Sequence, residues 1–142
     1  MSQTGYFIED LEVGQSAEYS REVTEDLIVK FADVSGDDNP VHLDADYAAT
    51  TQFGERIAHG MLSAGFISTV IGTRLPGPGA IYMSQNMQFR APVKIGDVVK
   101  AVGTVTEIDT RRRRATIETI CSVGETVVVK GEALVMVPSK SA

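Results

Sequence analysis

The chain has 142 residues, of which 43% are hydrophobic and 23% are charged. This length fits one ordinary domain, and the composition excludes disordered, collagen-like and coiled-coil proteins. Nineteen acidic against thirteen basic residues give a net charge of −6. We therefore expect a single domain over residues 1–142 and no nucleic-acid partner, because nucleic-acid affinity depends on basic residues that neutralise phosphates.

Cysteine content and hydropathy favour a cytoplasmic protein without a membrane span. The single cysteine, Cys121, cannot form an internal disulfide. The first ten residues lack the basic and apolar regions of a signal peptide. The longest uncharged stretch, residues 57–73, has 17 residues and three glycines, whereas a spanning helix needs about 20 mostly apolar residues. We interpret this stretch as a buried helix.

The first half of the chain carries helix signals. Thr24 is a suitable N-cap for a helix over residues 25–34, and the two acidic residues that follow it favour the first turn of that helix. Ser35-Gly36 is expected to end the helix. Asp44 is expected to cap a short helical segment over residues 45–50.

The run from His59 to Leu75 is apolar on nearly every side and ends at Pro76-Gly77, which predicts a helix that is covered all round. The second half is rich in Val, Ile and Thr and partly alternates, which predicts strands. With one upstream strand, the expected strands cover residues 16–23, 80–89, 98–108, 115–123 and 126–137. An α+β fold follows, in which a curved antiparallel sheet wraps the helix.

Residues 35–44, SGDDNPVHLD, contain the densest group of functional side chains. Turn-forming residues fix this loop, and rigid loops often display catalytic groups. Asp37 and His42 stand five positions apart across a proline bend, a spacing that lets both side chains reach one water molecule or one exchanging proton. The alternative is an ordinary turn between helices with a structural histidine.

A second group, His59-Gly60-Met61, opens the long apolar helix. The first N–H groups of a helix have no intrahelical acceptor, and the helix dipole is positive there, so glycine makes this a suitable oxyanion site. A plain helix start, at which His59 caps or packs, is the alternative.

Taken together, these segments resemble the MaoC-like hydratases, and within them the (R)-specific enoyl-CoA hydratases. The resemblance extends from about Thr24 to Val137. It implies a hot-dog fold and a homodimer with sheets joined edge to edge and acyl-CoA bound between protomers, with neither metal nor cofactor. The matching segments are Ser35-Gly36-Asp37-x-Asn39-Pro40-x-His42-x-Asp44, His59-Gly60-Met61, residues 75–82 and residues 89–97.

The resemblance also implies catalytic roles. Asp37 and His42 match the dyad that activates water and returns a proton to C2 of the enoyl thioester. The N–H of Gly60 matches the donor to the thioester oxyanion. Ser68 matches a serine near the catalytic water; the alternative is a buried serine bonded to a backbone carbonyl.

Supporting and binding residues complete the expected site. Asn39 is expected to lock the loop and orient Asp37, with His59 as a second supporting residue. The run Arg111–Arg114 suits a solvated turn, with contact to CoA phosphates as the alternative. Candidate walls of the acyl pocket are the three helix residues Leu62, Phe66 and Ile67.

Other activities of the same fold stay open. Known hot-dog thioesterases and some acyl-carrier-protein dehydratases place a catalytic carboxylate on the central helix, and residues 61–74 contain no acid. An acyl-carrier-protein substrate and a non-catalytic acyl-CoA-binding module remain alternatives. The same chemistry serves acyl chains of different length and several pathways, among them polyhydroxyalkanoate precursor supply and fatty-acid metabolism.

Overall fold

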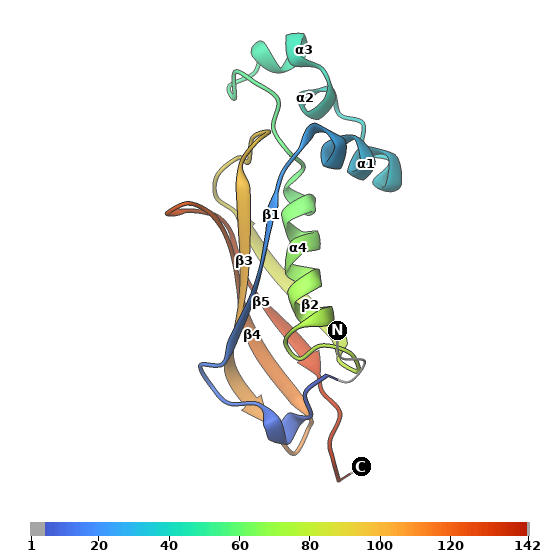
Figure 1. Cartoon of the computed structure of the whole chain (residues 1–142), viewed down its shortest axis with the longest axis vertical. Coiled ribbons are helices and arrows are strands. Elements are labelled where there is room, and N and C mark those ends of the chain that lie inside the picture. The colour runs from blue at the N-terminus through green and yellow to red at the C-terminus, as the bar shows by residue number, and fades with distance from the viewer. Residues whose placement is uncertain (1–4, 142) are drawn as a thin grey trace.

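The computed structural model describes residues 5–141 and contains a five-stranded antiparallel sheet with one long helix (Figure 1). Residues 1–4 and Ala142 lie outside this description. The first ten residues, in which no signal peptide is expected, are therefore described only from residue 5 onward. Within residues 5–141, no helix is long and apolar enough to cross a membrane. The elements are η1 (Ile8–Asp10), β1 (Ser16–Glu22), α1 (Glu25–Ser35), α2 (Pro40–Leu43), α3 (Ala45–Ala49), α4 (Gly60–Thr73), β2 (Ile81–Phe89), β3 (Val98–Asp109), β4 (Arg114–Val123) and β5 (Thr126–Met136).

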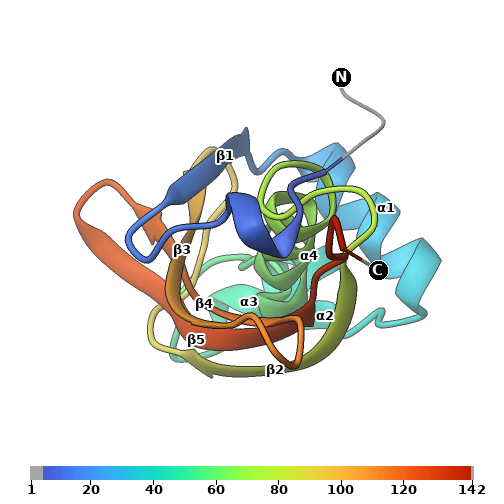
Figure 2. The same ribbon diagram turned by 90° about the horizontal axis from the view of Figure 1, so that it is seen from below.

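The sheet has the strand order β1-β3-β4-β5-β2 and curls around α4 (Figure 2). The helix approaches the sheet closely at Gly103 of β3, where an added Cβ would lie 3.1 Å from Val70 and 3.2 Å from Ile117. Each large apolar side chain buried between these layers contributes about 1.5–3 kcal/mol. The buried residues of α4 are Leu62, Ser63, Phe66, Ile67, Val70 and Ile71.

The predicted architecture, a curved sheet around an apolar helix, is confirmed. Helix α4 is slightly shorter than expected, and residues 124–125 form the tight turn between β4 and β5, with Gly124 at φ 59°. The sequence patterns missed α2 and η1, because three or four residues are too few to show a helical period.

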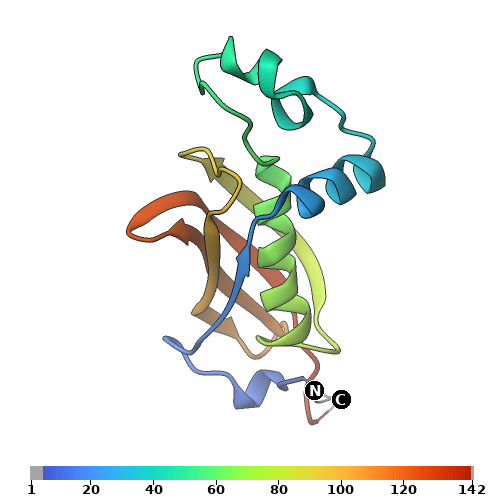
Figure 3. The same ribbon diagram turned by 45° about the horizontal axis from the view of Figure 1, so that its top comes forward.

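Helices α1, α2 and α3 gather beyond the N-terminal end of α4 (Figure 3). The Thr24 hydroxyl caps α1 by accepting from Leu27 N at 3.2 Å, and Gly36 ends it at φ 82°. Asp44 caps α3 by accepting from the N–H groups of Asp46 and Tyr47. These caps are as predicted, and they fix the loop between α1 and α2 near the start of α4.

Candidate active site

Asp37 lies exposed on the loop between α1 and α2, and local hydrogen bonds define its position. Its N–H donates to Ser35 Oγ at 3.1 Å, and its carboxylate accepts from Asn39 N at 3.3 Å. The Asn39 side chain in turn accepts from Val41 N at 3.0 Å and caps α2. Asn39 therefore links the Asp37 carboxylate to the helix that carries His42.

His42 is buried on α2 with 8% of its surface exposed. Its Nδ1 lies 2.8 Å from the Ile57 carbonyl oxygen. Because a carbonyl oxygen only accepts, Nδ1 carries the proton and Nε2 keeps a free lone pair. Burial lowers the pKa of His42, and the nearby His59 lowers it further, against the raising effects of the Ile57 carbonyl and of Asp37. The ring is thereby kept in its neutral, basic form.

His59 connects the two predicted catalytic residues. Its Nε2 donates to the backbone oxygen of Asp37 at 2.9 Å, and its ring stacks on that of His42 with centroids 3.8 Å apart. Phe31 packs on the same ring at 4.8 Å. The residue is 2% exposed, and within residues 5–141 its Nδ1 has no hydrogen-bond partner. His59 provides no side-chain cap for α4, so it packs rather than caps.

Asp37, His42 and His59 each offer a ligand atom, and these atoms lie within 4.8 Å of one another. The two imidazole rings are stacked with an interplanar angle of 26°. The nitrogen lone pairs of stacked rings lie in two nearly parallel planes, so an ion bound by both rings would lie well out of the plane of at least one of them. One nitrogen of each ring bonds to a carbonyl oxygen, which leaves one nitrogen of each ring for other contacts. The arrangement therefore fits an acid–base group better than a metal site.

Gly60 is the first residue of α4, directly after His59. Its N–H has no intrahelical acceptor and lies at the positive end of the helix dipole. The Phe89 ring covers this position, since a Cβ on Gly60 would lie 2.7 Å from Phe89 Cδ1. Ser68, two turns further along, is exposed on α4, so the alternative of a buried serine is wrong.

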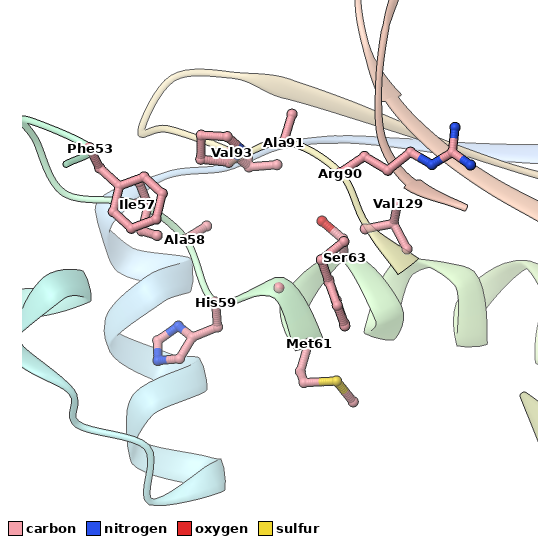
Figure 4. A pocket seen from close by; sticks show the side chains of 13 residues that line it. Phe53, Ile57, Ala58, His59, Met61, Ser63, Arg90, Ala91, Val93 and Val129 are labelled. Carbon is pink, nitrogen blue, oxygen red and sulfur yellow. The ribbon is translucent and has the colours of Figure 1, made fainter. Parts of the chain in front are cut away.

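An apolar cavity of about 470 Å³ opens beside the start of α4 (Figure 4). The His59 ring points away from it toward α1, so the cavity and the Asp37–His42 pair meet at His59 and Gly60. The Ser63 hydroxyl faces the cavity from α4 (Figure 4). The lining consists of Phe53, Ile57, Ala58, His59, Gly60, Met61, Ser63, Phe89, Arg90, Ala91, Pro92, Val93 and Val129.

Several expected binding residues lie elsewhere. The three candidate acyl-pocket walls, Leu62, Phe66 and Ile67, belong to the hydrophobic core and are not part of this lining. Arg111–Arg114 forms the β3–β4 turn region at the end of the sheet far from α1–α3 (Figure 1), with Arg111, Arg112 and Arg113 exposed. Within one chain this turn is remote from the site.

Sequence reasoning overlooked the cavity wall formed by residues 89–93. The only signal there was the segment FRAPV, which carried a family resemblance but no role for its side chains. These residues reach the site because Val93 O accepts from Ala58 N at 2.7 Å, which joins the segment after β2 to the segment before α4. Such a long-range contact leaves no local pattern in the sequence.

A sheet curled around one central helix is the hot-dog fold. The solved structure of the unliganded R-hydratase PhaJ1 from Pseudomonas aeruginosa superposes with a TM-score of 0.90 and 50% identity, covering 96% of this chain and 88% of that chain. The MaoC like domain model matches residues 9–129. The chain belongs to the MaoC-like domain family.

Two curated relatives match nearly the whole chain. An (R)-specific enoyl-CoA hydratase from Rhodospirillum rubrum is 53% identical over 135 residues, which cover 95% of this chain and 94% of the relative. A 3-hydroxybutyryl-CoA dehydratase from Methylorubrum extorquens is 54% identical over 134 residues, which cover 94% of this chain and 85% of the relative. Hydration and dehydration are the two directions of one reaction, so both names describe hydro-lyase chemistry.

Proposed function

We propose that this protein is an (R)-specific enoyl-CoA hydratase, a single-domain hydro-lyase that converts trans-2-enoyl-CoA reversibly into (R)-3-hydroxyacyl-CoA. The observation that carries the proposal is that His59 joins two groups: its ring lies with Asp37 and His42 in one cluster, and it lines an apolar cavity together with Gly60 at the start of α4. High identity to relatives of that name supports it. We place the protein in the cytoplasm, in keeping with its single buried cysteine, Cys121.

Asp37 and His42 form the acid–base dyad. Hydration adds the oxygen of water to C3 and a proton to C2, so one group must take a proton from water and one must deliver a proton to carbon. The unprotonated Nε2 of His42 and the Asp37 carboxylate hold the attacking water, and the same pair then returns the proton to C2. Positioned proton transfer of this kind contributes roughly 10²–10⁴-fold to the rate.

Gly60 stabilises the charge that develops on the substrate. As water adds to C3, negative charge builds on the thioester oxygen until C2 is protonated. The N–H at the start of α4 donates to that oxygen, and the helix dipole supports it. One such donor is worth about 10²–10³-fold in rate. Water addition causes no net change of oxidation state, so the reaction requires no redox cofactor, and the Gly60 N–H supplies the oxyanion stabilisation that a Lewis-acidic metal could otherwise give.

Three other residues support the reaction. Asn39 fixes the Asp37 carboxylate, while His59 bonds to the Asp37 backbone and packs against the His42 ring. By its match to the family serine, we assign to Ser68, which is exposed on α4, a hydrogen bond to the catalytic water. Removal of a supporting hydrogen bond costs less than removal of the dyad, because the acid and the base remain in place.

The active form is a homodimer that binds acyl-CoA between protomers. Strand β2 lies at the edge of the sheet, next to β5 alone, and exposes the apolar residues Ile81, Tyr82 and Met83. An unpaired apolar edge is a liability that pairing with a second β2 removes. The acyl chain occupies the apolar cavity, to whose lining α4 contributes Gly60, Met61 and Ser63.

The proposal is tested by adding crotonyl-CoA to the purified protein and following both the enoyl-thioester absorbance and free CoA thiol. A hydratase bleaches the absorbance without releasing thiol. Asp37→Asn should abolish most of this activity, whereas Asp38→Asn, at the neighbouring exposed carboxylate, should retain it. Thiol release would identify a thioesterase, and equal activity of the two variants would refute the assigned dyad.

A further inference from the structure

Arg56 makes two strong contacts from the segment that precedes α4. Its Nε donates to the backbone oxygen of His42 at 2.8 Å, and its Nη1 lies 2.7 Å from Glu25 Oε1 at the start of α1. The Arg56 side chain is only 14% exposed, whereas that of Glu25 is 66% exposed. One guanidinium group thus joins the first helix to the residue that carries the base.

The helix that holds His42 depends on such outside contacts. Helix α2 has four residues, too few to be stable alone, and its last carbonyl groups have no intrahelical donors. Arg56 and Ile57 supply three bonds to it. Besides the Arg56 contact, Ile57 N donates to Val41 O at 3.3 Å, and Ile57 O accepts from His42 Nδ1 at 2.8 Å. Two consecutive residues, Arg56 and Ile57, therefore hydrogen-bond to the backbone and to the ring of His42.

We infer that Arg56 is a positioning residue for catalysis, which orients the His42 imidazole by holding its carbonyl oxygen through a guanidinium that is itself anchored by Glu25. The inference rests on the proposed function, in which His42 belongs to the dyad. Arginine suits this role because its planar fork presents several donors in fixed directions. A lysine keeps the charge but presents one compact ammonium, which cannot hold both partners in this geometry.

The decisive variant is Arg56→Lys, assayed by steady-state hydration of crotonyl-CoA. Arg56 does not line the cavity, so KM should stay within about twofold, while kcat falls about tenfold, the value of one lost charge-assisted hydrogen bond. Glu25→Gln leaves the bond to His42 in place and should cost less than about threefold. Lys94→Met is the matched control, since it removes a neighbouring ion pair with Glu55 but no contact to His42.

A double-variant cycle separates positioning from general destabilisation. In a His42→Ala background no imidazole remains to be oriented, so Arg56→Lys should reduce the residual kcat by less than about twofold. The same tenfold loss in both backgrounds, or no loss in the wild-type background, would overturn the inference.

Titration of His42 by NMR tests the same inference without turnover. The titratable groups around His42 are Asp37, the His59 ring and, on its carbonyl, Arg56. Burial lowers the pKa of His42. Loss of the Arg56 hydrogen bond in Arg56→Lys should admit water around the His42 ring and raise this pKa toward 6.5. Lys94→Met should leave the pKa unchanged. An unchanged His42 pKa in Arg56→Lys refutes the positioning role. If the wild-type protein hydrates no enoyl-CoA, the proposed function fails separately, and the titration still decides whether Arg56 holds His42.

Discussion

Replacement of Gly60 by alanine should separate activity from stability. The added Cβ would lie 2.7 Å from Phe89 Cδ1 and 2.8 Å from Cε1, so the ring must retreat by roughly 0.7 Å to reach ordinary contact. Phe89 is 54% exposed, so little packing opposes a shift of its ring. Alanine favours helix over glycine by up to about 1 kcal/mol, so the free energy of unfolding should be unchanged or raised. Misplacement of groups by about 1 Å can cost 10²-fold in rate, and we expect kcat/KM to fall between tenfold and a hundredfold.

Enoyl-CoA hydration kinetics and denaturant unfolding of the same preparations measure these two effects. Gly72→Ala is the control on the same helix, because its added Cβ meets no atom within 4 Å. If the clash with Phe89 is the cause, Gly60→Ala should add little further loss in a Phe89→Ala background. A full additional loss there would refute the steric reasoning and would mean that the methyl group itself obstructs the substrate.

Three further predictions concern the proposed acid–base group. Asp37→Asn should lower kcat by at least 10²-fold while the denaturation midpoint stays close to that of the wild type, because the side chain is exposed; comparable kcat values would contradict its role. The pKa of His42 is lowered from 6.5, so the neutral base persists as the pH falls, and the acid limb of kcat/KM should lie below pH 6.5. A limb at or above that value would argue against His42 as the base. Ser68→Ala should cost about tenfold or less, and a loss equal to that of Asp37→Asn would show that its role is misassigned.

Much of the fold follows from local patterns in the sequence. The run from His59 to Leu75 is apolar on all sides, and such a helix requires a wrapping layer, which the Val- and Ile-rich second half provides. The caps at Thr24 and Asp44 could be predicted because each rests on one side chain and the next few N–H groups. Helix α2 could not, since four residues are held by contacts from a distant segment.

The candidate site was predictable only in part for the same reason. Asp37 and His42 share one loop, and Gly60 opens a recognisable helix, so their residue types and spacing were informative. The stacking of His42 on His59 depends on the path of the chain between them, because the two residues are 17 positions apart in the sequence. The wall that includes Phe89 depends on pairing across the sheet. These contacts are set by tertiary packing, which no local pattern encodes.

The most direct test of the central claim is the chirality of the product that the purified protein forms from crotonyl-CoA. The account predicts (R)-3-hydroxybutyryl-CoA, formed at a rate that Asp37→Asn lowers by at least 10²-fold. An (S) product would contradict the assigned stereochemistry, and a rate that is insensitive to Asp37→Asn would contradict the assigned site.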